Sequence, residues 1–309
     1  MPELPDVVVY AEHLERRLKG ETLRKVRLAS PFVLRSVEPP LASIEGRALR
    51  GVSRLGKRLV FSFEGEEGGA ERFLVLHLMV AGRLRWRVGD APLPIPKKIG
   101  LLSLLFDHGT LLLTEASPKK RAWVRVVSGR EALAALDPGG LEPLEASEEA
   151  FVARLRSENH TLKRALTDPT LFSGIGNAYS DEILHAARLS PVALTSRLTD
   201  EETARLFDTT RATLVDWTDR LRRETGERFP EKVTAFREDM AVHGKFGKPC
   251  PRCGTAVQRI VYAANETNYC PACQTGGKLL ADRSLSRLLR GDWPKSLEEM
   301  EERIARSRS

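Results

Sequence analysis

The chain begins with the sequence MPELPD, and its second residue is the first candidate for chemistry. A residue as small as proline permits removal of the initiator methionine, which would leave Pro2 with a free secondary amine. An α-amino group titrates near about pH 8, so part of it is neutral at neutral pH and can attack electrophilic carbon. A secondary amine gives a cationic iminium, and the adjacent Glu3 could transfer protons. The alternative is that Pro2 and Pro5 only stiffen an arm before the first helix.

The four cysteines of the chain form two CxxC pairs with sixteen residues between them. Two-residue spacing lets both thiolates of a pair reach one ion, and four thiolates complete a tetrahedral zinc shell. We therefore predict one structural Zn²⁺ ion that holds the span from Thr255 to Tyr269 as a hairpin. A redox pair or an iron–sulfur cluster would not explain two matched pairs in a chain without other cysteines. The predicted ligands are Cys250, Cys253, Cys270 and Cys273.

A glycine-containing turn precedes an apparent helix in the second half of the chain. Gly174 and Gly176 bracket one residue there, and Asn177 follows. Backbone N–H groups at such a helix start can bind an anion, which the helix dipole also favours. Asn177 could add a side-chain donor, and Lys163 from an earlier helix could add positive charge. The alternative is an ordinary turn in which glycine supplies a positive φ.

Composition sets the class of protein in which these motifs must work. The chain has 309 residues, which suggests two domains, and 49 Lys and Arg against 42 Asp and Glu give a net charge of +7. A basic surface is suited to a polyanionic partner. No apolar run approaches the ~18 residues of a membrane span, and no signal peptide is visible. We expect a cytoplasmic, nucleoid-associated protein without a membrane partner.

The hydrophobic pattern divides the chain into a strand-rich half and a helical half. Apolar residues at helical spacing predict a helix over 6–19, and Gly20 follows as a stop. Short apolar runs between turn residues over 47–127 predict the strands of a sandwich or barrel. Beyond a linker at 137–143, Ser147 is expected to cap a short helix. Thr199 and Glu202 have the spacing of a capping box before a long helix that fades near Gly226.

Together these motifs resemble those of the formamidopyrimidine-DNA glycosylase/endonuclease VIII family of bifunctional glycosylases and abasic-site lyases. The opening MPELPD is similar to the family's MPELPE. Lys57 stands where the family has its catalytic lysine, and residues 77–82, HLMVAG, resemble its HLGMSG loop. Residues 171–184 resemble its helix–two-turn–helix motif, with Asn177 at the family's asparagine. The cysteine pairs resemble its zinc finger, so the resemblance covers residues 1 to about 276.

The resemblance implies an α+β fold with four parts. These are a catalytic β-sandwich domain over 1–136, a helix–two-turn–helix domain over 137–240, a zinc finger over 241–276 and an extension over 277–309, expected to be a solvated amphipathic helix. It also implies a base-excision-repair enzyme that acts as a monomer on double-stranded DNA carrying a damaged base or an abasic site. The damaged nucleotide must be flipped out of the duplex to be reached.

The resemblance also implies roles for individual residues. Pro2 would attack C1′ of the damaged nucleotide, Glu3 would assist ring opening and proton transfer, and Lys57 would hold a phosphate or act as an acid. The Pro2 iminium would then drive β-elimination of the strand. Substrate and DNA contacts are expected from Asp6, Lys119, Lys120, Lys163, Asn177 and Asn265.

Several positions depart from the family's pattern. Asp6 replaces a glutamate, Met79 and Val80 replace glycine and methionine, and Arg121 stands where a wedging phenylalanine is usual, although Trp123 is near. Asn265 replaces an arginine that grips phosphate and assists δ-elimination. Asparagine lacks the charge and the bidentate fork, which predicts a weaker grip by the finger and leaves δ-elimination open.

The departures also leave the substrate and two other classes of function open. The segment 226–247 is unlike the family's 8-oxoguanine-capping loop, so an oxidised pyrimidine, a ring-opened purine or a bulkier adduct are the open substrates. A damage-binding protein of the same fold without chemistry is the main alternative function. A zinc-ribbon protein acting on RNA is the third.

Overall fold

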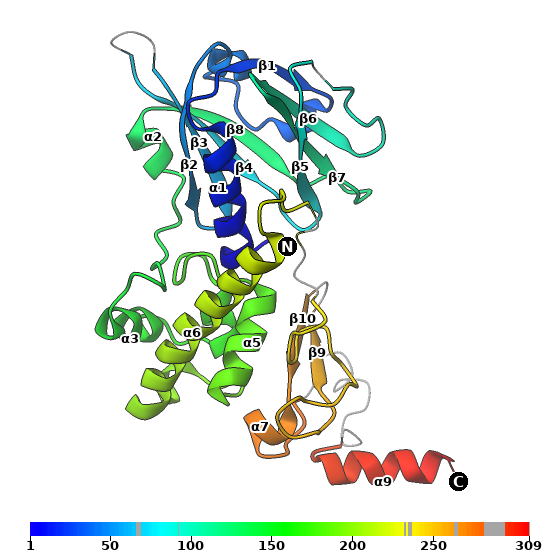
Figure 1. The fold of residues 1–309 in the computed structure, drawn as a ribbon. Helices are drawn as coiled ribbons and strands as arrows, with labels where there is room; N and C mark the ends of the chain where they lie inside the picture. The colour runs from blue at the N-terminus through cyan, green and yellow to red at the C-terminus, as the bar shows by residue number, and fades with distance from the viewer. Residues whose placement is uncertain are drawn as a thin grey trace. The chain divides into compact units, whose positions relative to one another are not determined.

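The computed structural model describes residues 1–65, 69–91, 93–231, 233, 237–262, 265–280 and 294–308. The chain forms two compact units (Figure 1). The N-terminal unit comprises Met1–Gly140 and Asp216–Ala235, and the C-terminal unit comprises Leu141–Val215 and Phe236–Ser309. Within the described ranges, no helix combines the length and apolar character needed to cross a membrane.

The N-terminal unit contains two four-stranded antiparallel sheets, as the strand pattern predicts. One sheet has the order β1-β6-β7-β5 and the other has the order β2-β3-β4-β8. Side chains from both sheets share one core that includes Phe61, Leu104 and Leu113. The strands are β1 (Leu23–Leu28), β2 (Leu49–Leu55), β3 (Arg58–Phe63), β4 (Arg72–His77), β5 (Gly82–Val88), β6 (Gly100–Phe106), β7 (Gly109–Glu115) and β8 (Trp123–Ser128).

Strand β3 is apolar at more than every second position because side chains on both of its sides pack into apolar clusters. Phe61 and Phe63 face the main core, in agreement with the alternation of the sequence. Val60 points to the opposite face, where it packs with Phe73 against the partly buried Leu133. The short helix α2 (Arg130–Ala134) covers part of that face, so Val60 is buried as well.

Helix α1 (Leu4–Leu18) begins two residues before the predicted start. Glu3 is its N-cap residue, and the Asp6 carboxylate accepts a hydrogen bond from the Glu3 backbone N–H at 2.9 Å. Pro5 is tolerated in the first turn because the N–H groups there have no intrahelical partner. The predicted apolar face is buried, and the helix packs on β2. Its buried residues include Val7, Tyr10, Ala11, Leu14 and Leu18.

The end of the long helix α6 (Asp200–Thr225) belongs to the N-terminal unit. Arg222 donates to the Glu12 carboxylate of α1 at 3.1 Å. Phe229, beyond the helix, packs on Tyr10 with ring centroids 5.9 Å apart. Apolar and ionic contacts to α1 therefore bring residues 216–235 into the first unit. A boundary set by such contacts between distant segments has no local signal in the sequence.

The C-terminal unit is helical and closes with a small hairpin, as expected. Ser147 caps α3, with its hydroxyl accepting from the Ala150 N–H at 3.3 Å, and Thr199 and Glu202 exchange capping-box hydrogen bonds of 3.0 and 3.2 Å. The elements are α3 (Glu148–Arg156), α4 (Leu162–Thr167), α5 (Asn177–Ala187), the first part of α6, β9 (Gln258–Tyr262), β10 (Asn265–Tyr269), α7 (Pro271–Thr275) and α9 (Leu297–Arg308). The described residues also contain 3₁₀ turns at Pro31–Val33, Leu41–Ile44 and Thr195–Arg197.

Candidate active site and zinc centre

The start of the chain is buried in the N-terminal unit. Pro2 is buried, and Glu3 and Asp6 are each 1% exposed. Burial lowers the pKa of the amino group at Met1 below its ordinary value of 8.0. The positive charges of Arg83 and Lys57 also lower this pKa, whereas the carboxylates nearby raise it. An amine released by removal of Met1 would therefore form within a cluster of charged groups that is largely shielded from water.

Lys57 lies in the turn between β2 and β3, as its sequence context predicts. Gly56 precedes it with a φ of +60°, a conformation that suits glycine. Burial lowers the pKa of the Lys57 ammonium below its ordinary 10.5, and the Glu3 carboxylate opposes this shift. The chain start, Glu3 and Lys57 are thus within electrostatic range of one another. These three groups bring together an amine of lowered basicity and an ammonium group, both partly buried, and the buried carboxylate of Glu3.

Asp6 is placed differently from the expectation that it contacts DNA. Its carboxylate is buried and accepts the Glu3 N–H, so it holds the first turn of α1. This contact also orients the backbone of Glu3. We therefore assign Asp6 a structural role, which is to hold the first turn of α1 and the backbone of Glu3, in place of the expected DNA contact.

In the turn at residues 77–82, the backbone at Met79 and at Gly82 has restricted conformations. Met79 has a φ of +51°, a left-handed conformation that glycine adopts more easily than methionine. A Cβ atom at Gly82 would lie 2.3 Å from the carbonyl oxygen of Leu78, so glycine is required there. Arg83 donates to the Gly82 carbonyl at 2.7 Å and to the Val80 carbonyl at 3.2 Å. Arg83 therefore supports this turn while its charge acts on the chain start.

His77 closes β4 beside the lysine turn. Its Nδ1 accepts the N–H of Met79 at 2.9 Å. Burial lowers the pKa of His77 to about 4, and the positive charges of Arg58, Lys57 and Arg35 act in the same direction. The ring is therefore neutral at neutral pH. It packs on Trp123 with ring centroids 5.6 Å apart.

The basic loop after β7 is held by Glu115, a residue that the sequence did not single out. The Glu115 carboxylate is buried and accepts the backbone N–H groups of Arg121 and Ala122 at 2.8 and 3.0 Å. Lys120 donates to the carbonyl oxygen of Glu115, and the Lys119 side chain is exposed. A lone acidic residue at the end of an apolar strand was the available signal. The loop thus presents Lys119, Lys120 and Arg121 on a fixed backbone.

The four cysteines meet in the C-terminal unit. Their sulfur atoms all lie within 4.8 Å of one another, with Cys253 Sγ at 3.4 Å from Cys270 Sγ. Four thiolates around a zinc ion at about 2.3 Å would be separated by about 3.8 Å, so the donor set fits zinc. His185 Nε2 lies 3.2 Å from the Cys250 sulfur, the position of an outer-shell partner. Four protein ligands leave no open position, which indicates a structural ion.

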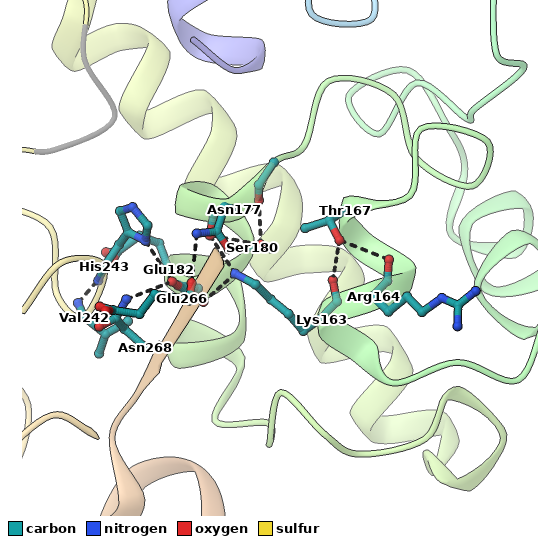
Figure 2. A network of polar contacts seen from close by, with 12 residues as sticks. Lys163, Arg164, Thr167, Asn177, Ser180, Glu182, Val242, His243, Glu266 and Asn268 are labelled. Atoms are coloured by element: carbon teal, nitrogen blue, oxygen red, sulfur yellow. Dashed lines mark hydrogen bonds and ion pairs between the residues drawn. The ribbon is translucent and has the colours of Figure 1, made fainter. Parts of the chain in front are cut away.

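The glycine turn before α5 contains both features that the sequence suggested. Gly174 has a φ of +80° and so serves the turn, and Gly176 is the N-cap of α5. The amide of Asn177 donates to the backbone carbonyl of Glu266 in β10 at 2.8 Å (Figure 2). Asn177 therefore links the helix start to the hairpin of the finger.

Lys163 does not supply the free positive charge that was expected at this turn. Its ammonium donates to the Asn177 carbonyl at 2.6 Å and to the Asp181 carboxylate at 2.5 Å (Figure 2). Its side chain is only 13% exposed, and that of Asp181 is 0% exposed. The expectation is corrected because a buried carboxylate neutralises this lysine. The sequence analysis did not identify Asp181 and its neighbour Glu182 as functional residues. The available signal was a pair of adjacent acids in the predicted helix.

Asn265 begins β10 and pairs in register with Tyr262. The side chain of Asn265 lies outside the part of the chain that the structure describes. Its predicted role at the tip of the finger therefore stays a prediction.

Three models from one protein family match successive parts of the chain. The formamidopyrimidine-DNA glycosylase N-terminal domain matches residues 1–132, the H2TH domain of the same enzyme matches residues 140–219, and a zinc finger found in FPG and IleRS matches residues 247–276. The chain belongs to the formamidopyrimidine-DNA glycosylase family. This membership confirms the predicted family and fold class, and the finger match together with the cysteine cluster confirms the prediction of one structural zinc ion.

Relatives and solved structures of this family cover most of the chain. The formamidopyrimidine-DNA glycosylase of Thermus thermophilus is 34% identical over 284 residues, which is 90% of this chain and 100% of that protein. That of Pelotomaculum thermopropionicum is 31% identical over 284 residues, with 89% and 99% covered. The Lactococcus lactis enzyme bound to DNA with an oxidised pyrimidine superimposes with a TM-score of 0.76, at 28% identity, over 89% of this chain and 100% of that chain. Its complex with abasic-site DNA gives a TM-score of 0.75, at 28% identity, over 88% and 99%.

The zinc centre gives a prediction about local stability. Replacing Cys270 with serine removes one of four thiolates, so the bound zinc should fall well below one ion per chain. The hairpin β9–β10 should then lose protection from hydrogen exchange, while the sheets of the N-terminal unit keep theirs. Zinc analysis and hydrogen-exchange mass spectrometry measure both effects, and chelator treatment of the unmodified protein should reproduce them. A hairpin that stays protected without zinc would contradict the assignment.

Proposed function

We propose that this protein is a base-excision-repair DNA glycosylase that uses the amine of Pro2 as its nucleophile and nicks the resulting abasic site by β-elimination. The observation that supports it most is the buried cluster of the chain start, Glu3 and Lys57. Enzymes activate amine nucleophiles by burial and by neighbouring positive charge, since both raise the neutral fraction. At the chain start, burial is the largest effect on the Met1 amine, the charges of Arg83 and Lys57 act in the same direction, and the carboxylates of Glu3 and Asp6 oppose them.

The first chemical step joins the Pro2 nitrogen to C1′ of the damaged nucleotide. The bond between C1′ and the base breaks, and the base leaves with a proton. Opening of the sugar ring then needs a proton on O4′, which Glu3, buried beside the amine, can transfer. The product is an iminium between Pro2 and C1′, a cationic group that withdraws electrons from the sugar.

The second step breaks the DNA strand. The Glu3 carboxylate, which has given its proton to O4′, can accept a proton from C2′. The electron pair of that C–H bond moves toward the iminium, and the bond between C3′ and its oxygen breaks with the 3′ phosphate as leaving group. Lys57 supplies positive charge near the reacting sugar, and the carboxylate of Glu3 lies within its electrostatic range. Its lowered pKa also suits it to proton transfer, because a catalytic pKa near the working pH is most effective.

The substrate that fits this chemistry is a DNA duplex with a damaged base or an abasic site. The Lactococcus lactis relative is seen with an oxidised pyrimidine, a ring-opened guanine and an abasic site. We propose that a monomer binds the duplex with the exposed loop at 119–121 and with the start of α5 at Asn177, where contacts to phosphate position the strand. A nucleotide flipped out of the duplex can then reach the amine.

Borohydride reduction tests the proposal directly. The protein should give a covalent adduct with abasic-site DNA, and Pro2→Gly should reduce its yield by about tenfold or more, since glycine leaves a flexible primary amine in place of the fixed secondary amine. Pro31→Gly makes the same change at an exposed residue of the N-terminal unit and should leave the yield unchanged. Peptide mapping locates the adduct. Tight binding of damaged DNA without any adduct would instead indicate a damage-binding protein.

The lysine turn makes a prediction about pH. The amine is neutral above its pKa, so adduct formation should rise as the amine loses its proton. Burial lowers the pKa of the Met1 amino group, and the same surroundings should lower the pKa of the Pro2 amine that removal of Met1 exposes. The charge of Lys57 lowers this pKa, so Lys57→Met should raise it and move the rising limb of the single-turnover rate to higher pH. Lys19→Met changes a lysine with a 65% exposed side chain in the same unit and should leave the limb in place. If the rate of Lys57→Met rises at the same pH as that of the unmodified protein, Lys57 does not influence the pKa of the amine.

A further inference from the structure

A buried carboxylate in α5 collects contacts from three separate segments of the C-terminal unit. Lys163 Nζ of α4 lies 2.5 Å from one oxygen of Asp181. His243 Nδ1 lies 2.8 Å from the other oxygen, and Asn268 Nδ2 of β10 lies 3.5 Å from it. The Asp181 side chain is 0% exposed, and those of Lys163 and His243 are 13% and 6% exposed. Asp181 thus joins α4, the finger hairpin and the segment that leads into the finger.

The next residue fixes that same segment by its backbone. The Glu182 carboxylate accepts the N–H groups of Ala241, Val242 and His243 at 2.8, 2.9 and 2.9 Å. Three consecutive backbone donors on one carboxylate leave the segment little freedom to slide or rotate. Asp181 and Glu182 therefore hold the side chain and the backbone of one short stretch before Cys250.

The other side of the network reaches the proposed DNA-contact residue. The Lys163 ammonium that pairs with Asp181 also donates to the Asn177 carbonyl at 2.6 Å. The Asn177 amide donates to the Glu266 carbonyl of the hairpin at 2.8 Å. The start of α5 and the finger hairpin are therefore tied by two routes, one through Asn177 and one through Asp181.

We propose that Asp181 is the positioning residue of the DNA-contact surface, which sets the start of α5 and the zinc hairpin in one fixed arrangement for gripping the phosphate backbone. The inference rests on the DNA binding proposed above. Because Asp181 is fully buried, it acts through Lys163, Asn268 and His243 and touches no DNA itself. Zinc shapes the finger, and Asp181 orients it on the helical part.

The proposal predicts that Asp181→Asn weakens DNA binding, whereas charge alone would predict stronger or unchanged binding. Removing a negative charge from a DNA-binding protein should strengthen binding, or leave it unchanged, if charge alone mattered. Asp181→Asn removes such a charge but also leaves the Lys163 ammonium without its buried partner, which disrupts the arrangement. A positioning role therefore predicts weaker binding.

The experiment measures binding to a duplex with a tetrahydrofuran abasic-site analogue, which forms no Schiff base and so does not depend on the proposed chemistry. Asp181→Asn should raise the Kd by about tenfold, the size expected when coupled neighbours are disturbed. The slope of log affinity against log salt should stay the same, because no phosphate contact loses its charge. Asp208→Asn makes the same charge change at an exposed residue of α6 and should not weaken binding.

The double variant Lys163→Met/Asp181→Asn separates positioning from a direct lysine contact. If the two residues act as a pair, the double variant should bind DNA better than Lys163→Met alone, which leaves the buried Asp181 carboxylate without its lysine partner. If Lys163 gripped phosphate directly, the double variant would bind no better and its salt slope would fall by about 0.9. This comparison decides the question even if Asp181→Asn fails to fold.

Two more measurements complete the test. Each variant should retain one zinc ion per chain, and the borohydride adduct formed at saturating protein should match that of the unmodified protein. The proposal is overturned if Asp181→Asn binds the analogue as tightly as the unmodified protein or more tightly. An unmodified protein that binds the analogue but forms no adduct would refute the lyase chemistry and leave the positioning test intact.

Discussion

The burial of the chain start is the constraint on which the proposed chemistry depends. A free N-terminal amine in solvent would be mostly protonated at neutral pH and would find a sugar carbon only by chance. Here α1 packs its apolar face into the core, and its first turn is held by the hydrogen bond between Asp6 and Glu3. This places the chain start within electrostatic range of Lys57, where burial lowers the pKa of the Met1 amino group, and the same surroundings would act on the Pro2 amine. Catalytic geometry therefore follows from the packing of one helix.

In the C-terminal unit, the zinc finger must be held in shape and oriented on the helices. A finger of about thirty residues has too small an apolar core to hold its shape, so four thiolates and an ion supply the stability. Its orientation on the helices then rests on buried polar contacts of Asp181 and Glu182. In both units, carboxylates removed from water act as fixed acceptors for backbone or charged donors. Such groups are costly to bury without partners, which makes the arrangement specific.

The sequence predicted the features that depend on local spacing. The buried face of α1, the capping residues Ser147 and Thr199, and the cysteine pairs all follow from periodicity or from the reach of neighbouring side chains. The sequence misjudged Lys163, because its charge is neutralised by a residue eighteen positions away that only the fold brings near. The contacts that Arg222 and Phe229 make with α1 could not be predicted for the same reason. Tertiary partners decide whether a polar side chain is free to bind a ligand.

The central claim is that the active protein begins with the amine of Pro2. Mass spectrometry of the intact native protein, recovered from a preparation with proven adduct-forming activity, tests this most directly. The account predicts that the chain lacks Met1 and that the N-terminal peptide starts at Pro2 with an unmodified amine. An active preparation in which Met1 is fully retained, or in which the Pro2 nitrogen is acylated, would contradict the account.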